Sequence, residues 1–177
     1  GKSQVIWTYN GILDGCGKTI SNYDLSVSAT NSAMVAALNG TIRNLNLDAS
    51  CSFTQKTSGA DFSAGSLAGT VNATGRIENC RSNASVIVNS TGGRTQVRVG
   101  GIAGRIYPGV ELSDCEFGGT ISVTAPSGAD LVCGGITAFV PNGTASVKLT
   151  GCTNSANISL TELQSGKMVR LGGIVGI

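Results

Sequence analysis

The segment GRIENCRSNASVIV, residues 75–88, decides the fold because it recurs along the chain. The counterparts that superimpose on it are residues 40–53 (GTIRNLNLDASCSF), 110–123 (VELSDCEFGGTISV) and 147–160 (VKLTGCTNSANISL). Their equivalent aliphatic positions are Ile42, Ile77, Leu112 and Leu149, so the steps are 35, 35 and 37 residues. A fixed period of this length indicates a solenoid built from stacked units.

Each repeat has the alternation of β-strands. In the segment around Val86, apolar residues alternate with Ser and Asn, and many are β-branched. This period of two is typical of strands with one buried face, whereas helical periodicity is weak everywhere. We therefore expect three short strands per repeat: one around Ile77, one around Val86, and one from Val97 to Ile102.

A unit of this kind cannot bury its apolar face alone, so successive units must stack. We predict an all-β parallel β-helix, or β-solenoid, of about five coils with no substantial helix. Equivalent residues would then form internal columns about 4.8 Å apart along the axis. The columns that we expect are Phe62/Val97/Leu131/Val169, Ala64/Val99/Cys133/Leu171, Leu67/Ile102/Ile136/Ile174 and Cys51/Val86/Ile121/Ile158.

Charged residues on the outward face support the same register. One predicted column runs Thr41, Arg76, Glu111, Lys148, so opposite charges follow one another from coil to coil. In-register parallel stacking favours such cross-strand pairs.

The composition excludes several classes of protein. The chain has 177 residues, 12 basic and 10 acidic side chains, and no histidine. The lack of histidine removes Ser-His-Asp catalysis and His-ligated metal sites. Charges are scattered and no apolar run reaches membrane length, so we expect no nucleic-acid partner and no membrane span. We predict no cofactor and no metal.

The phrase Gly100-Gly-Ile-Ala-Gly104, the tetrad Ile77-Glu-Asn-Cys80 and the opening Tyr9-Asn-Gly-Ile-Leu-Asp-Gly-Cys-Gly-Lys-Thr-Ile-Ser-Asn22 resemble the GLUG-repeat proteins of bacterial cell surfaces, especially of Bacteroides-type organisms. The resemblance covers about Tyr9 to Ile177. It implies a right-handed β-helix in an exported, adhesin-like protein, secreted or associated with the bacterial outer membrane. It supplies no catalytic residue.

We expect residues 1–177 to form a single domain. Residues 1–16 would provide an N-terminal cap with the first strand, and residues 17–177 the repeats. The sequence stops inside a repeat, so we expect a fragment of a longer surface protein whose open last coil could make an end-to-end contact.

Two sets of repeated polar or sulfur residues are predicted to be structural. Cys80, Cys115 and Cys152 share one column, where parallel side chains hold their Cβ atoms too far apart for a disulfide, so we expect stacked buried thiols rather than a metal site. The residues just before this column are predicted to form an amide ladder at a coil corner. They are Asn22, Asn44, Asn79 and Asp114.

The candidate ligand-facing residues are Arg98, Arg170, Arg76 and Glu111. Arg98 and Arg170 could contact an acidic glycan, but a solvated face is the better explanation. For Arg76 and Glu111, a surface row of ion pairs that includes Lys148 is the better explanation. Our prediction is a non-enzymatic adhesin-like or structural module that binds a glycan or a host or cell-surface protein. The alternative is a polysaccharide lyase or hydrolase, which would need clustered carboxylates or basic groups on one face.

Overall fold

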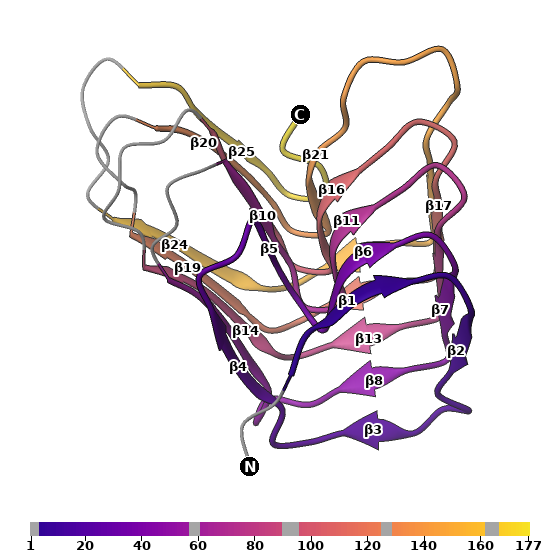
Figure 1. The fold of residues 1–177 in the computed structure, drawn as a ribbon. Coiled ribbons are helices and arrows are strands. Elements are labelled where there is room, and N and C mark those ends of the chain that lie inside the picture. Colours follow the sequence, from indigo (N-terminus) through magenta and orange to yellow (C-terminus); the bar gives the residue numbers. More distant parts are fainter. Residues whose placement is uncertain (1–3, 57–60, 90–95, 125–128, 162–166) are drawn as a thin grey trace.

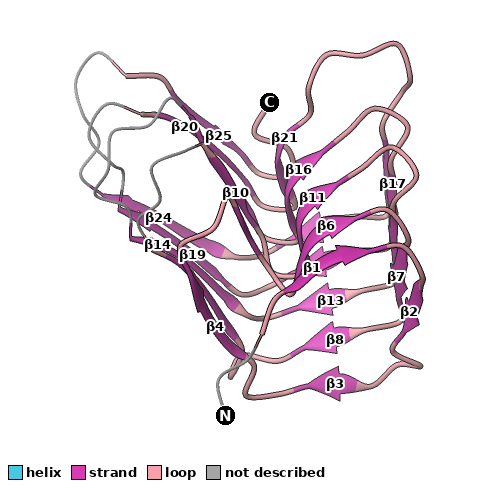
Figure 2. Ribbon diagram, in the orientation of Figure 1, coloured by secondary structure: helices cyan, strands magenta, loops and turns pink. Residues whose placement is uncertain are grey.

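The computed structural model describes residues 4–56, 61–89, 96–124, 129–161 and 167–177. Every regular element in these ranges is a β-strand, and five parallel sheets run along one axis (Figures 1 and 2). None of the described segments is a helix long and apolar enough to span a membrane.

Each sheet takes one strand from each of five coils. Sheet 1 contains β1 (Ile6–Tyr9), β6 (Val35–Leu38), β11 (Ala68–Val71), β16 (Ala103–Ile106) and β21 (Thr137–Phe139). Sheet 2 contains β2 (Ile12–Asp14), β7 (Thr41–Arg43), β12 (Arg76–Glu78), β17 (Glu111–Ser113) and β22 (Lys148–Thr150). Sheet 3 contains β3 (Thr19–Ile20), β8 (Asn46–Leu47), β13 (Arg81–Ser82), β18 (Glu116–Phe117) and β23 (Thr153–Asn154).

The last two sheets complete each coil. Sheet 4 contains β4 (Asp24–Val27), β9 (Ser52–Gln55), β14 (Ser85–Asn89), β19 (Thr120–Thr124) and β24 (Asn157–Thr161). Sheet 5 contains β5 (Asn31–Ser32), β10 (Phe62–Ala64), β15 (Gln96–Gly100), β20 (Asp130–Gly134) and β25 (Val169–Gly172). The predicted all-β parallel solenoid is confirmed.

The number of strands per coil differs from the prediction of three, because two predicted strands are each divided. The strand around Ile77 stops at Asn79, whose φ of 49° turns the chain before β13 begins. The strand from Val97 to Ile102 ends at Gly100, and the chain bends before β16 starts at Ala103. Each coil therefore has five short strands.

The predicted register holds along most of the core. Ile77 pairs with Ile42 on one side and Leu112 on the other, and all three are fully buried. Phe62 pairs with Val97, which pairs with Leu131. Each coil thus buries its apolar face against its neighbours, as the alternating pattern indicated.

One predicted column was wrong in one coil. Val86 pairs with Phe53, not with Cys51. The turn of residues 48–51, closed by a hydrogen bond from Cys51 N to Asp48 O, has two more residues than residues 83–84 of the next coil. Counting back by the 35-residue period therefore misses the partner by two positions.

Sheets 1 and 5 meet at a concave corner. In Figure 1 the strands of sheet 5 (β10, β20 and β25) and those of sheet 1 (β6, β11, β16 and β21) diverge from this corner as two arms. Glycine permits the close approach: a Cβ on Gly104 would lie 2.5 Å from Ala64 N. The recurring glycines therefore serve backbone packing at this bend.

The N-terminal segment belongs to the first coil. Residues 1–3 of the predicted cap lie outside the described residues, whereas β1 and β2 pair in parallel with β6 and β7. Trp7 on β1 is 64% exposed, so it covers little of the core.

Candidate functional site

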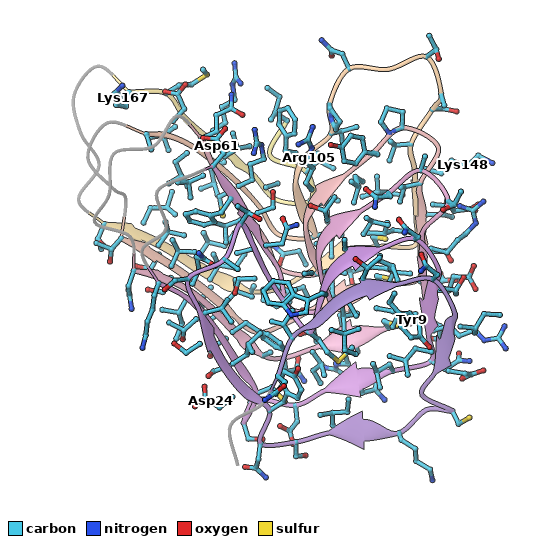
Figure 3. The ribbon with its side chains drawn as sticks, in the orientation of Figure 1. Tyr9, Asp24, Asp61, Arg105, Lys148 and Lys167 are labelled. Carbon is cyan, nitrogen blue, oxygen red and sulfur yellow. The ribbon has the colours of Figure 1, made fainter. Side chains whose placement is uncertain are left out.

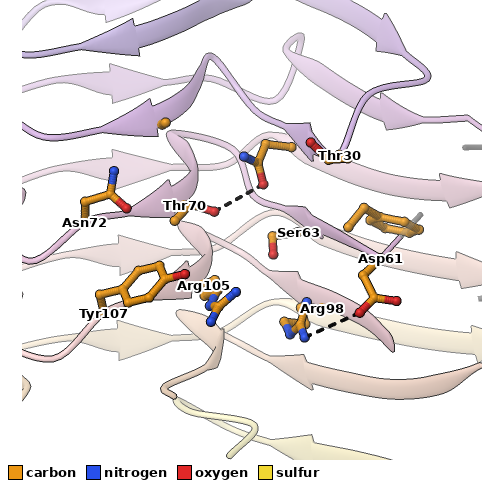
Figure 4. Close-up of a pocket in the computed structure, with 11 residues that line it drawn as sticks. Thr30, Asp61, Ser63, Thr70, Asn72, Arg98, Arg105 and Tyr107 are labelled. Atoms are coloured by element: carbon orange, nitrogen blue, oxygen red, sulfur yellow. Dashed lines mark hydrogen bonds and ion pairs between the residues drawn. The ribbon is translucent and has the colours of Figure 1, made fainter. Parts of the chain in front are cut away.

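A pocket of about 350 Å³ lies in the concave corner between sheets 1 and 5 (Figure 4). Sheet 5 supplies Ser63 and Arg98, which are register partners on adjacent strands. Sheet 1 supplies the column Ala37, Thr70 and Arg105. Outward side chains of two sheets therefore face each other across one groove, which we call the corner groove.

Arg98 lies on the sheet 5 wall and is only 8% exposed, although its alternation with Val97 and Val99 places it on the outward face. Its guanidinium donates a hydrogen bond to the side-chain oxygen of Gln96, and its Nη2 lies 3.9 Å from Asp61 Oδ2. Its Nε is buried without a hydrogen-bond partner. The expected solvated face is wrong for Arg98, because the concave corner covers this outward position.

Arg105 projects from the opposite wall beside two aromatic rings. Its guanidinium carbon lies 4.3 Å from the centre of the Tyr107 ring and 5.6 Å from that of Phe139, which also lies 4.8 Å from the guanidinium carbon of Arg98. Cation–π contacts of this kind hold a guanidinium in place without neutralising it. The Nε of Arg105 is likewise buried without a partner.

The two arginines interact electrostatically. Burial lowers the pKa of Arg98, and the positive charge of Arg105 acts in the same direction, against a smaller opposite effect of Asp61. Figure 3 shows Asp61 and Arg105 on the two arms that border the corner. Two arginines and one carboxylate, Asp61, leave this part of the groove with a net positive charge.

Arg170, the other predicted glycan contact, lies further along the same wall. It pairs with Val132, which pairs with Arg98, so two strand spacings separate the arginines, about 9.6 Å. Arg170 is exposed. The structure thus places both arginines on one face but in different surroundings.

Arg76 and Glu111 lie on sheet 2 in the predicted column, with Lys148 next to Glu111. The three residues border a second pocket, of about 380 Å³. Arg76 Nη1 donates weak hydrogen bonds to backbone oxygens of Gly75 and Gly109, at 3.4 and 3.5 Å. The column is aligned as predicted, but among the described residues no ion pair joins its members. The predicted row of ion pairs is therefore not formed by direct contacts.

The predicted amide ladder occupies the corner between sheets 2 and 3. Asn44, Asn79 and Asp114 have φ of 51°, 49° and 51°, in the left-handed region that Asn and Asp tolerate better than most residues. Asn79 Nδ2 donates to Asn44 Oδ1 at 2.8 Å. Asn22, which we grouped with them, instead lies at the corner between sheets 3 and 4, where its N–H donates to Ser50 Oγ at 2.7 Å.

Asp14 ends this ladder in the first coil. It accepts hydrogen bonds from Asn44 Nδ2 at 3.1 Å and Arg43 Nε at 2.8 Å. These contacts, together with the Cys16 N–H, lower the pKa of Asp14 to about 2, with the Asn44 contact having the largest effect. The carboxylate therefore stays charged and structural.

The cysteine column is present and its thiols are free. Cys80 and Cys115 are buried and Cys152 is half-buried. Burial raises the pKa of Cys80 to about 11. A hydrogen bond between the two side chains lowers the pKa of Cys152 to about 7 and raises that of Cys115, which burial raises further. Within the described ranges, no three His, Cys, Asp or Glu side chains gather as a metal-binding group.

Sequence reasoning missed Arg105, Tyr107, Phe139 and Asp61 as neighbours of Arg98. The 35-residue spacing of Thr70 and Arg105 indicates that they share one column. The spacing of a repeat does not reveal that this column faces sheet 5. The clustered glycines around residues 100–104 were the available indication of a sharp bend.

Comparison with known proteins leaves the family open. No family model matches the chain and no curated protein matches it, so the GLUG resemblance stays a prediction. Among solved structures, one from Bacteroides ovatus described as a "putative immunoglobulin A1 protease" is similar, with a TM-score of 0.45 and 15% identity over 92% of this chain and 68% of that chain. We draw no functional argument from a likeness at this level.

Proposed function

We propose that this β-solenoid is a non-enzymatic, adhesin-like module of an exported or cell-surface protein, and that its corner groove binds a glycan. The observation that carries the proposal is the pair of aromatic-flanked arginines in a pocket lined by hydroxyl and amide side chains. The groove is lined by the hydroxyl groups of Thr70 and Ser63 and by the amides of Asn31 and Asn72. Glycans are recognised by such hydrogen-bonding groups around an apolar ring surface.

The groove supports binding better than hydrolysis. A glycosidase needs two carboxyl groups on either side of the scissile bond, about 5 to 9.5 Å apart. Asp61 is the one carboxylate among the described residues that line the pocket. The alternative lyase activity keeps some support from Tyr107 beside Arg105, because a phenol can exchange a proton with a sugar carbon.

A glycan array with the purified chain tests the proposal. Ala37 lies on the groove wall in register with Thr70, so Ala37→Trp fills the groove, whereas Thr120→Trp introduces the same side chain on the exposed face of sheet 4. We expect Ala37→Trp to abolish binding and Thr120→Trp to leave it unchanged. Equal binding by both variants would place the ligand elsewhere, and accumulation of unsaturated sugar products would favour the lyase.

A further inference from the structure

The two arginines of the corner groove point to the chemistry of its ligand. They come from different sheets, Arg98 from β15 and Arg105 from β16, and converge because the chain bends between residues 100 and 103 (Figure 4). The side chain of Arg98 is 10% exposed. Two guanidinium groups held this close in a sheltered corner repel each other unless an anion lies between them.

The described residues of the groove supply one carboxylate for the two cations. Asp61 forms a long ion pair with Arg98, at 3.9 Å, and one of its oxygens also accepts the Gln96 N–H at 2.9 Å. Within the described part of the chain, Arg105 has aromatic contacts but no ion pair. The buried Nε atoms of both arginines lack hydrogen-bond partners. Buried donors of this kind are normally satisfied, so these two guanidinium groups are incompletely paired by the described residues.

The aromatic rings fix how the guanidinium groups are presented. Tyr107 and Phe139 contact the guanidinium groups through their rings, so in-plane N–H groups other than the Arg98 Nη2–Gln96 contact are left to bind an anion. These N–H groups match the planar, two-oxygen geometry of a carboxylate and also suit the oxygens of a sulfate. A lysine pair would carry the same charge without this geometry.

We propose that the corner groove binds an acidic glycan by seating one carboxylate or sulfate group between Arg98 and Arg105. This inference rests on the proposed glycan-binding function and narrows it to one ligand class. Arg170, two strands further along the wall, is placed to contact a second acidic group of the same chain.

Calorimetric titration with defined oligosaccharides tests this inference. The probes are oligogalacturonate, which carries carboxylates, its carboxyl-reduced neutral form, and a chondroitin sulfate oligosaccharide, which carries sulfates as well. We expect the acidic probes to bind and the neutral form to bind at least about tenfold more weakly. The stronger of the two acidic probes identifies the preferred group.

Matched variants locate the acidic group. Arg105→Gln should weaken acidic binding about 10- to 100-fold, because it removes a charge-assisted contact. Arg81→Gln makes the same charge change on sheet 3, where Arg81 is exposed and paired with Glu116, and should change affinity less than twofold. Arg98→Lys keeps the charge of the buried position and should still weaken binding, with circular dichroism reporting whether the fold is retained.

The outcomes separate the two proposals. Equal affinity for acidic and neutral forms, or equal effects of Arg105→Gln and Arg81→Gln, would overturn the acidic subsite while glycan binding stands. Failure of every glycan to bind would overturn the proposed function and this inference with it.

Discussion

Replacing Asn79 tests how the corner between sheets 2 and 3 is stabilised. Asn79 has two separable roles: it adopts a φ of 49°, and its Nδ2 donates to Asn44 Oδ1 at 2.8 Å. Asn79→Ala removes the hydrogen bond and places a Cβ without a compensating polar group in the left-handed region. Asn79→Gly removes the same hydrogen bond but has no Cβ to strain.

The structure gives a magnitude for each role. A left-handed conformation costs an ordinary L-residue roughly 1–2 kcal/mol, and a net hydrogen bond contributes about 0.5–1.5 kcal/mol. We therefore expect Asn79→Ala to lower the free energy of unfolding by about 1.5–3.5 kcal/mol. Asn79→Gly should lower it by only about 0.5–1.5 kcal/mol.

Urea unfolding followed by far-ultraviolet circular dichroism measures both variants. Ser122→Ala, on the exposed face of β19, is the control and should change stability by less than about 0.5 kcal/mol. A double-mutant cycle with Asn44→Ala isolates the amide–amide contact. If Asn79→Gly destabilises as much as Asn79→Ala, backbone strain plays no part and this account of the corner is wrong.

Three further predictions concern the core, a thiol and a carboxylate. Ile77→Ala should lower the free energy of unfolding by about 2–5 kcal/mol, because Ile77 is fully buried between two coils; a loss below about 1 kcal/mol in urea unfolding would contradict this. In a Cys16→Ser variant, which lacks the exposed thiol, Cys152 should react with a thiol reagent at neutral pH, and the rate should increase as the pH rises through about 7. Cys133, with a pKa of about 12, should stay unreactive until the protein unfolds. Asp14→Asn should lower the free energy of unfolding at pH 7. Because folding lowers the pKa of Asp14 from 3.8 to about 2, the difference in stability between the variant and the wild type should shrink as the pH falls through this interval and vanish below it. A stability difference that persists at pH 1.5 would refute the reasoning.

The sequence predicted the stacking because equal spacing forces register wherever the turns have equal length. Ile42, Ile77 and Leu112 are separated by 35 residues, and they pair directly. The same rule failed for Cys51 and Val86. The turn of residues 48–51 has two extra residues, so Val86 pairs with Phe53 instead. Alternation cannot reveal this, because a shift of two residues keeps every side chain on the same face.

The corner groove was harder to predict, for a different reason. Alternation correctly put Arg98 on the outward face, and an outward arginine is normally solvated. Whether that face meets solvent depends on the angle between sheets 1 and 5, which is set by the bend after Gly100. This angle brings Arg105 opposite Arg98. The alternation of residues within one strand does not predict the angle between two sheets.

The groove also shows how a solenoid can acquire a site without changing its fold. Ala37, Thr70, Arg105 and Phe139 occupy one outward column of sheet 1, in register from coil to coil. Their side chains range from a methyl group to a cation and an aromatic ring, yet the backbone pairing is the same throughout. Since the core columns carry the stability, each outward position can vary independently, and recognition by this chain is therefore expected to depend on the order of side chains along the groove.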